Sequence, residues 1–354
     1  MRKILLYLLL LTHALVANKP YATEDVFFEN GAITLAGTLT IPTEKKPTYV
    51  ALLVSGFGPN DRDQHIYGHK TLLVLADHLA KHGIASLRYD KRGIGKSTGQ
   101  YQLATTKDFA DDALAGVQYL TKKFPKVGLI GHSEGGAIAT VVAAKSQDIA
   151  FVVSMAGPAV SGEEVLYEQG RLLQKAIGID QQKIEEDRKL REEMFAVVKS
   201  ESDFQVIEQK LKLLTTKHFS SPRHASTQAN EGLAVLHPGN VDLTIRQICS
   251  PWFRYFLTFD SSEYLKDVEA PFLALGAEKD LQVPPHQSLP AVAKTLHAAK
   301  KTNYEVKKLP HLNHLFQTCQ TGAISEYSKI EETIAPSALQ AITDWISVNP
   351  ASST

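Results

Sequence analysis

The sequence predicts an α/β protein whose mostly parallel central sheet is flanked by helices and carries a helical insertion. Short apolar runs alternate with amphipathic segments along most of the chain, which is typical of strands separated by helices. This alternation stops over residues 159–262 and then resumes. With 354 residues, 44% of them hydrophobic, the chain can bury a core on both faces of such a sheet.

The first predicted element is a β-hairpin. Residues 26–28 and 34–41 have strand character and flank Asn30-Gly31, a pair that suits a turn with positive φ. Apolar runs after the hairpin predict strands over 49–54, 85–89, 127–130, 151–155, 271–275 and 304–309. Periodic segments predict helices over 71–81, 106–123, 287–299 and 337–348, and one more helix after Ser133.

The insertion is rich in charged residues and helix formers. Within it, Leu190, Met194, Val197 and Val198 fall on one face of a helix, whereas Asp187 and Arg191 are spaced for an ion pair on the solvated face. We therefore expect residues 23–158 and 263–354 to form the core, with 159–262 inserted between its two parts.

Residues 1–22 have the pattern of a secretory signal peptide. Arg2 and Lys3 form a charged start, residues 4–11 are apolar, and Ala17 and Ala22 offer alternative cleavage sites. We expect an exported chain, periplasmic or secreted, with no stable membrane insertion after cleavage; a retained anchor is the alternative, but the apolar run is short for a spanning helix.

Export would permit the two cysteines of the chain, Cys249 and Cys319, to form a disulfide. Two separate buried thiols are the alternative, because free cysteine is among the most buried residue types. The sequence leaves both possibilities open.

Several partners and cofactors are disfavoured. The 38 basic and 38 acidic residues balance, so no overall field attracts nucleic acid. His65 and His69 have metal-ligand spacing but no third ligand nearby, and we predict no metal and no other cofactor. Gly95-Lys96-Ser97 resembles the end of a phosphate-binding loop, but Asp90 stands where that motif needs glycine.

Gly131-His132-Ser133-Glu134-Gly135 lies where a predicted strand ends and a helix of small residues begins. Such a turn exposes a serine hydroxyl to a base, and its glycines avoid collisions across the turn. The G-x-S-x-G spacing alone arises by chance in roughly one chain in ten of this length, so a base and an acid are also required. His132, beside the serine, is interpreted as a packing residue.

Candidates for the acid and the base follow the last two strands, where the reactive groups of an open parallel sheet collect. Asp280 and its rival Glu278 follow the strand at 271–275. His314 and its rival His311 follow the strand at 304–309.

Together these segments resemble a secreted α/β-hydrolase-fold serine esterase of the serine aminopeptidase-like group, similar to bacterial carboxylesterases. The resemblance covers nearly all of the mature chain. It favours His314 over His311 and implies a triad of Ser133, Asp280 and His314, together with a helical cap formed by 159–262. The segments that carry it are 55–63 (SGFGPNDRD), 88–97 (RYDKRGIGKS), the turn around Ser133, 251–256 (PWFRYF), 276–284 and 313–317 (NHLFQ).

The implied reaction is the hydrolysis of a small-molecule carboxylic ester, with a short or medium acyl group, through an acyl-enzyme on Ser133. His314 would act as the base, Asp280 would orient it, and the backbone N–H groups of Phe57 and Glu134 would stabilise the oxyanion. Peptide or amide hydrolysis, acyl transfer and binding without catalysis are the alternatives. The oligomeric state is open.

Three aromatic or charged features have alternative interpretations. In the family that this chain resembles, a smaller residue is common at the position of Phe57. We expect the Phe57 ring to narrow the acyl pocket. Trp252 and Phe256 either line that pocket or pack the insertion onto the sheet. Asp61-Arg62-Asp63 either braces the active-site loops or forms a surface ion pair.

Overall fold

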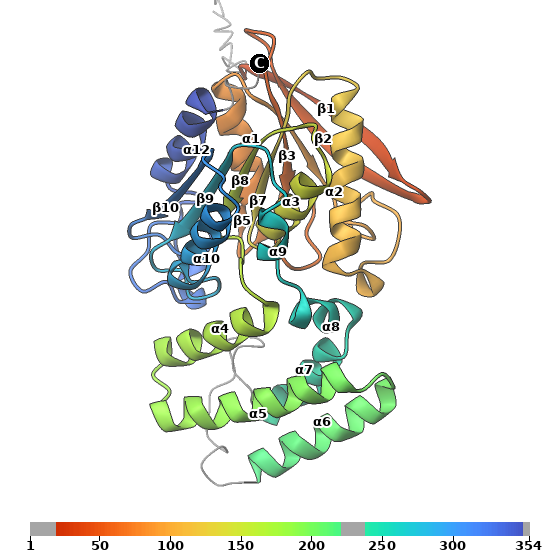
Figure 1. Ribbon diagram of the computed structural model, residues 1–354, viewed down its shortest axis with the longest axis vertical. Coiled ribbons are helices and arrows are strands. Elements are labelled where there is room, and N and C mark those ends of the chain that lie inside the picture. Colours follow the sequence, from red (N-terminus) through yellow and green to blue (C-terminus); the bar gives the residue numbers. More distant parts are fainter. Residues whose placement is uncertain (1–18, 221–237, 350–354) are drawn as a thin grey trace, which may run out of the picture.

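The computed structural model describes residues 19–220 and 238–349, which form one sheet-based core and a group of helices beside it (Figure 1). The large sheet has eight strands in the order β1-β2-β6-β3-β7-β8-β9-β10. The pairs β1/β2 and β2/β6 are antiparallel and the others are parallel, which confirms the predicted fold class. The strands span Tyr21–Asn30, Ile33–Pro42, Ala85–Tyr89, Val50–Val54, Val127–His132, Ile149–Met155, Phe272–Ala277 and Tyr304–Leu309, in sheet order.

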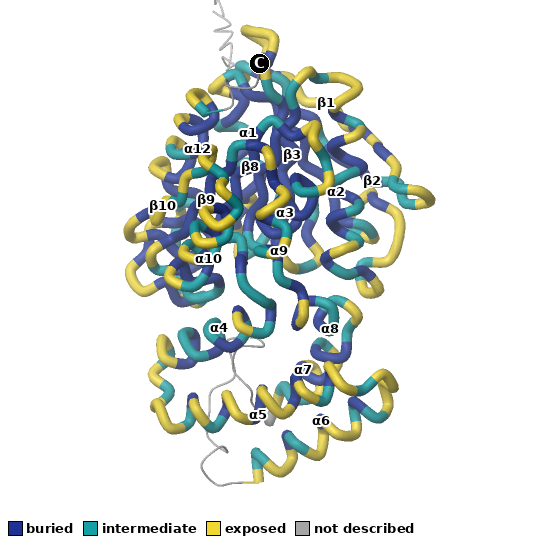
Figure 2. Tube along the Cα trace, viewed as in Figure 1, coloured by how far each residue is buried: buried dark blue, intermediate teal, exposed yellow. Residues whose placement is uncertain are grey.

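Helices cover both faces of the sheet. On one face, α2 (Thr106–Thr121), α3 (Glu134–Lys145) and α10 (Pro285–Ala298) pack on residues such as Leu52. On the other, α1 (Thr71–Lys81) and α12 (Pro336–Val348) pack on residues such as Leu53. Successive strand residues point to opposite faces, so the apolar runs are buried on both sides, as the dark centre of Figure 2 shows.

The N-terminal hairpin forms as predicted, with Gly31 at φ 57° in its turn. Tyr21 and Ala22, which the sequence assigns to the leader, are the first residues of β1. The Tyr21 hydroxyl donates to Asp77 of α1 at 2.8 Å, which ties the start of the strand to the core. Residues 1–18 of the predicted leader lie outside the described residues.

The predicted insertion forms helices between β8 and β9. They are α4 (Gly162–Ala176), α5 (Gln181–Ser200), α6 (Phe204–Phe219), α7 (Val241–Ile248) and α8 (Pro251–Thr258), here called the insert. The insert lies below the sheet in Figure 1 and has its own hydrophobic cluster, which includes Leu190, Met194 and Val198. A short helix, α9 (Ser262–Leu265), leads back to β9.

Two local predictions were wrong or incomplete. Asp187 and Arg191 do not lie on a solvated face: they are 1% and 7% exposed, and Asp187 lies 3.0 Å from His218 of α6. The small hairpin of β4 (His65–Ile66) and β5 (His69–Lys70) was not predicted, because two-residue strands carry no periodic signal.

The two cysteines do not form a disulfide. Both are buried free thiols, Cys249 in the insert core and Cys319 beside the carbonyl oxygen of His311. Burial raises the pKa of each thiol. Over the described ranges, no helix combines the length and the apolar character that crossing a membrane requires.

Candidate active site

Ser133 occupies a sharp turn between β7 and α3, with a strained φ of 56°. The turn is possible because its glycines lack side chains. A Cβ on Gly131 would lie 2.0 Å from the carbonyl oxygen of Gly135, and one on Gly135 would lie 2.1 Å from that of Val54. The turn therefore presents the serine at the carboxyl edge of the sheet.

The structure brings Ser133, His314 and Asp280 into one hydrogen-bonded chain. His314 Nε2 lies 3.0 Å from Ser133 Oγ, and His314 Nδ1 lies 2.7 Å from Asp280 Oδ2. The other Asp280 oxygen accepts hydrogen bonds from the backbone N–H groups of Gln282 and Val283 at 2.8 and 2.9 Å. With Asp280 only 2% exposed, these bonds fix its carboxylate toward the imidazole.

The rival residues lie apart from this chain. The His311 side chain is 71% exposed and its Nδ1 lies 3.6 Å from Glu278, which is itself partly exposed. Glu278 also accepts a hydrogen bond from the His311 backbone N–H. The two rivals therefore contact each other and not Ser133.

A buried hydrogen-bond network holds the loop of His314. Asn313 Oδ1 accepts from the backbone N–H groups of Leu315 and Gln317, both at 3.0 Å. The Gln317 amide contacts the buried ring of His69, so His69 braces this loop. The described residues hold no group of three His, Cys, Asp or Glu side chains placed to bind a metal.

The His132 ring packs beside His314. Its Nε2 donates to the His314 carbonyl oxygen, and its Nδ1 accepts from Gln64, both at 2.8 Å. Gln64 also accepts from the Gly56 N–H at 3.1 Å, so the direction of each bond is fixed. Complete burial, with the nearby charge of His314, lowers the pKa of His132 to about 3, and the ring is neutral at pH 7. Sequence reasoning did not find Gln64, which lies 68 positions from His132.

The two expected oxyanion donors flank the serine. Glu134 is the first residue of α3, and Phe57 lies in the loop after β3. Within the described parts of the chain, neither backbone N–H has a hydrogen-bond partner. Gly56, which precedes Phe57, packs against Ser133: a Cβ on Gly56 would lie 3.1 Å from the Cβ of Ser133.

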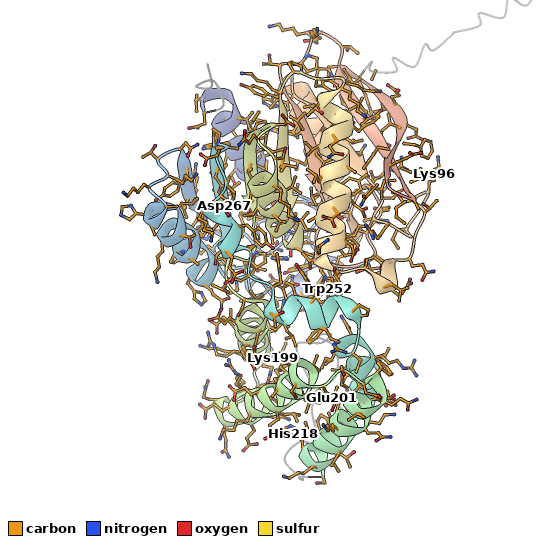
Figure 3. The ribbon with its side chains drawn as sticks, turned by 45° about the vertical axis from the view of Figure 1, so that its right-hand side comes forward. Lys96, Lys199, Glu201, His218, Trp252 and Asp267 are labelled. Atoms are coloured by element: carbon orange, nitrogen blue, oxygen red, sulfur yellow. The ribbon has the colours of Figure 1, made fainter. Side chains whose placement is uncertain are left out.

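A cavity of about 330 Å³ opens beside Ser133 between the core and the insert. Its wall includes the rings of Phe57, Trp252 and Phe256. The centroids of the Phe57 and Trp252 rings lie 4.2 Å apart, and Trp252 stacks on Phe256 with a centroid separation of 4.7 Å. Val165 of α4 also lines the cavity. Figure 3 places Trp252 where the insert meets the core, so it both packs the insert and lines the cavity.

The Asp61-Arg62-Asp63 segment forms a mostly buried charge network. The Arg62 guanidinium binds both carboxylate oxygens of Asp90, and Asp63 pairs with Arg88. Burial alone would raise the pKa of Asp90, but hydrogen bonds, chiefly from Arg62, lower it. The network joins the loops after β3 and β6, so the bracing interpretation describes it better than a surface ion pair.

The sequence profile described as Serine aminopeptidase, S33, matches residues 69–208. Esterase EstD of Thermotoga maritima is 35% identical over 160 residues. That match covers 44% of this chain and 39% of the esterase, so the chain is similar to only part of this relative.

Two solved structures resemble this chain over most of their length. The esterase Pf2001 of Pyrococcus furiosus has a TM-score of 0.54 at 13% identity, with 94% of each chain covered. The α/β hydrolase GrgF of Penicillium sp. sh18 has a TM-score of 0.54 at 17% identity, with 94% of this chain and 99% of GrgF covered. At these identities the likeness concerns the fold. Together with the sheet order and the turn at Ser133, it shows that the chain has the predicted α/β-hydrolase fold.

Proposed function

We propose that the chain is a serine hydrolase that cleaves carboxylic esters of small molecules, with a short or medium acyl group. The observation that carries the proposal is the hydrogen-bonded chain from Asp280 through His314 to Ser133, because His314 and Ser133 line the cavity. The 35% identity to a part of esterase EstD and the esterase among the similar folds support the same activity.

In the proposed mechanism, Ser133 Oγ attacks the acyl carbon while His314 Nε2 takes its proton. Asp280 holds the imidazole in the required tautomer and stabilises its positive charge. The N–H groups of Phe57 and Glu134 donate to the oxyanion, and His314 returns the proton to the leaving alkoxide. Water then attacks the acyl-enzyme by the same proton transfers and releases the acid.

The lining of the cavity favours esters over peptides with a free N-terminus. Among its described residues the only carboxylate is Glu134, and Lys91, Thr106 and Trp252 already donate to it. A substrate ammonium would therefore find no unpaired acidic side chain there. An aminopeptidase remains the second candidate because the matched family profile carries that description.

The test compares nitrophenyl esters of increasing acyl length with aminoacyl anilides, on wild type and on Ser133→Ala. We expect ester turnover by wild type, a loss of about 10⁴-fold or more in Ser133→Ala, and slow anilide turnover. A fluorophosphonate probe should label wild type only. Equal ester rates in the two proteins would overturn the mechanism, and faster anilide cleavage would favour the aminopeptidase.

We further propose that the chain is exported and that the insert acts as a cap that selects the acyl group. The charged and apolar pattern of the leader supports export. Val165, Trp252 and Phe256, which line the cavity, come from the insert. N-terminal sequencing of the protein from a periplasmic fraction tests the first proposal, since an intact Met1 there would contradict cleavage.

A further inference from the structure

Lys91 is a buried cation that reaches the oxyanion loop without touching Ser133. It follows β6 and is 2% exposed. Its ammonium donates to the Gly56 carbonyl oxygen at 2.6 Å and to Glu134 Oε2 at 3.2 Å. It also lies 4.3 Å from the centre of the Phe109 ring. Burial lowers the pKa of Lys91, and the charge of Glu134 opposes this effect.

The Gly56 carbonyl and the Phe57 N–H belong to the same planar peptide group and point in opposite directions. A donor that holds the carbonyl therefore also sets the direction of the N–H. Asn60 Nδ2 donates to the same carbonyl at 2.9 Å, but only Lys91 brings a charge. A positive charge at the oxygen draws electrons from the peptide and makes its N–H a stronger donor.

Glu134, the ion-pair partner of Lys91, is also the residue whose backbone N–H is the second expected oxyanion donor. Glu134 contributes its backbone N–H to the expected oxyanion site, and its side chain, from a residue only 3% exposed, pairs with Lys91. The Lys91–Glu134 ion pair therefore reaches both expected oxyanion donors. Lys91 binds the peptide group that carries the Phe57 N–H, and Glu134 carries the second N–H itself. Buried ion pairs are weak sources of stability, because desolvation offsets their attraction, so stability alone does not account for this one.

We propose that Lys91 is a positioning residue that orients and polarises the Phe57 N–H toward the oxyanion, with Glu134 as its counter-ion. This inference rests on the proposed serine hydrolase function. A loss of Lys91 acts on the transition state, in which the oxyanion is charged, and leaves binding of the neutral ester nearly unchanged.

The experiment measures kcat and KM for a nitrophenyl ester, and the affinity for a trifluoromethyl ketone, in wild type, Lys91→Met and Lys96→Met. The ketone forms a hemiketal with Ser133 whose oxygen occupies the oxyanion site. For Lys91→Met we expect kcat to fall roughly 10- to 100-fold, somewhat less than for direct loss of an oxyanion donor. We expect the ketone affinity to fall in parallel and KM to change little.

Lys96→Met is the matched control, because Lys96 is an exposed lysine of the same loop and should leave all three values unchanged. Lys91→Arg retains the charge and should recover part of kcat. If Lys91→Met does not fold, Lys91→Gln replaces it: this variant keeps a polar side chain at the buried site but brings no charge, and it should lower kcat about 3- to 10-fold at constant KM.

Wild-type kcat and ketone affinity in the folded Lys91→Met variant would overturn the inference. In the Lys91→Gln fallback, an unchanged kcat would do the same. A wild type that neither hydrolyses esters nor reacts with a fluorophosphonate would instead refute the proposed function.

Discussion

Trp252 of the insert donates a hydrogen bond from its indole Nε1 to Oε1 of Glu134, the residue after Ser133, at 2.6 Å. Glu134 is also the partner of Lys91. The insert is therefore linked to the turn of Ser133 through a partly buried hydrogen bond as well as through apolar packing. We expect a substitution in the insert at this contact to alter the geometry around Ser133.

Trp252→Phe removes this hydrogen bond and retains an aromatic ring in the cavity wall. We expect a loss of roughly 1 to 3 kcal/mol in the free energy of unfolding, because a buried carboxylate loses a donor. We also expect kcat/KM to fall several-fold. Denaturant unfolding and ester kinetics measure the two effects. Trp345→Phe, in α12, is the control for indole removal away from the cavity, and equal kcat/KM values in the two variants would contradict this prediction.

Phe57→Ser should widen the acyl site, because the Phe57 ring lies against Trp252 in the cavity wall. The backbone N–H of residue 57 is retained, so turnover of the shortest esters should change little. We expect the acyl-length profile to extend to longer chains. Phe27→Ser, which removes an exposed ring from β1, is the control. An identical profile in wild type and Phe57→Ser would disprove the narrowing role.

Asp280→Asn should impair catalysis without destroying the site. The asparagine preserves the size of the side chain but no longer stabilises the charge or the tautomer of His314. We expect kcat to fall about 10³- to 10⁴-fold with KM nearly unchanged. The control is Glu278→Gln, since Glu278 lies at the surface with His311. A larger loss in Glu278→Gln than in Asp280→Asn would reverse the assignment of the acid.

His132 should make the folded state less stable in acid. Its pKa is about 3 in the folded protein against an ordinary value of 6.5, so the unfolded chain binds the proton more tightly. The titration of His132 therefore leaves the free energy of unfolding unchanged above about pH 6.5. As the pH falls from there toward 3, it lowers the free energy of unfolding by at most about 1.4 kcal/mol per pH unit.

Urea unfolding between pH 7 and pH 4 measures this dependence. His132→Gln should show a flatter profile than wild type, although it is less stable at pH 7. The control His65→Gln changes an exposed imidazole and should retain the wild-type slope. A wild-type slope in His132→Gln would show that another group causes the acid sensitivity.

The sequence predicted those parts of the fold that have a local cause. The apolar runs around Leu52 and Leu129 are buried on both faces, and such runs indicate central parallel strands without any knowledge of neighbours. The burial of Asp187 could not be predicted in this way, because His218 of another helix pairs with it.

The same distinction between local and long-range causes separates the site residues that the sequence predicted from those that it did not. Ser133, Asp280 and His314 follow strands of a parallel sheet, and the topology brings strand ends together. The roles of Gln64 and Lys91 depend on contacts with residues 68 and 35 positions away, and no local pattern carries that information.

The closeness of the backbone around Gly131 and Gly135 has a consequence for how mutational scans and distant homologues of this protein are interpreted. Both glycines are required for steric reasons alone, since a methyl group at either would overlap a carbonyl oxygen. A scan that selects for folded protein should retain them even where the enzyme is inactive. Folding does not require the Ser133 hydroxyl. Retention of Ser133, and not retention of the two glycines, therefore indicates that a sequence was selected for catalytic activity.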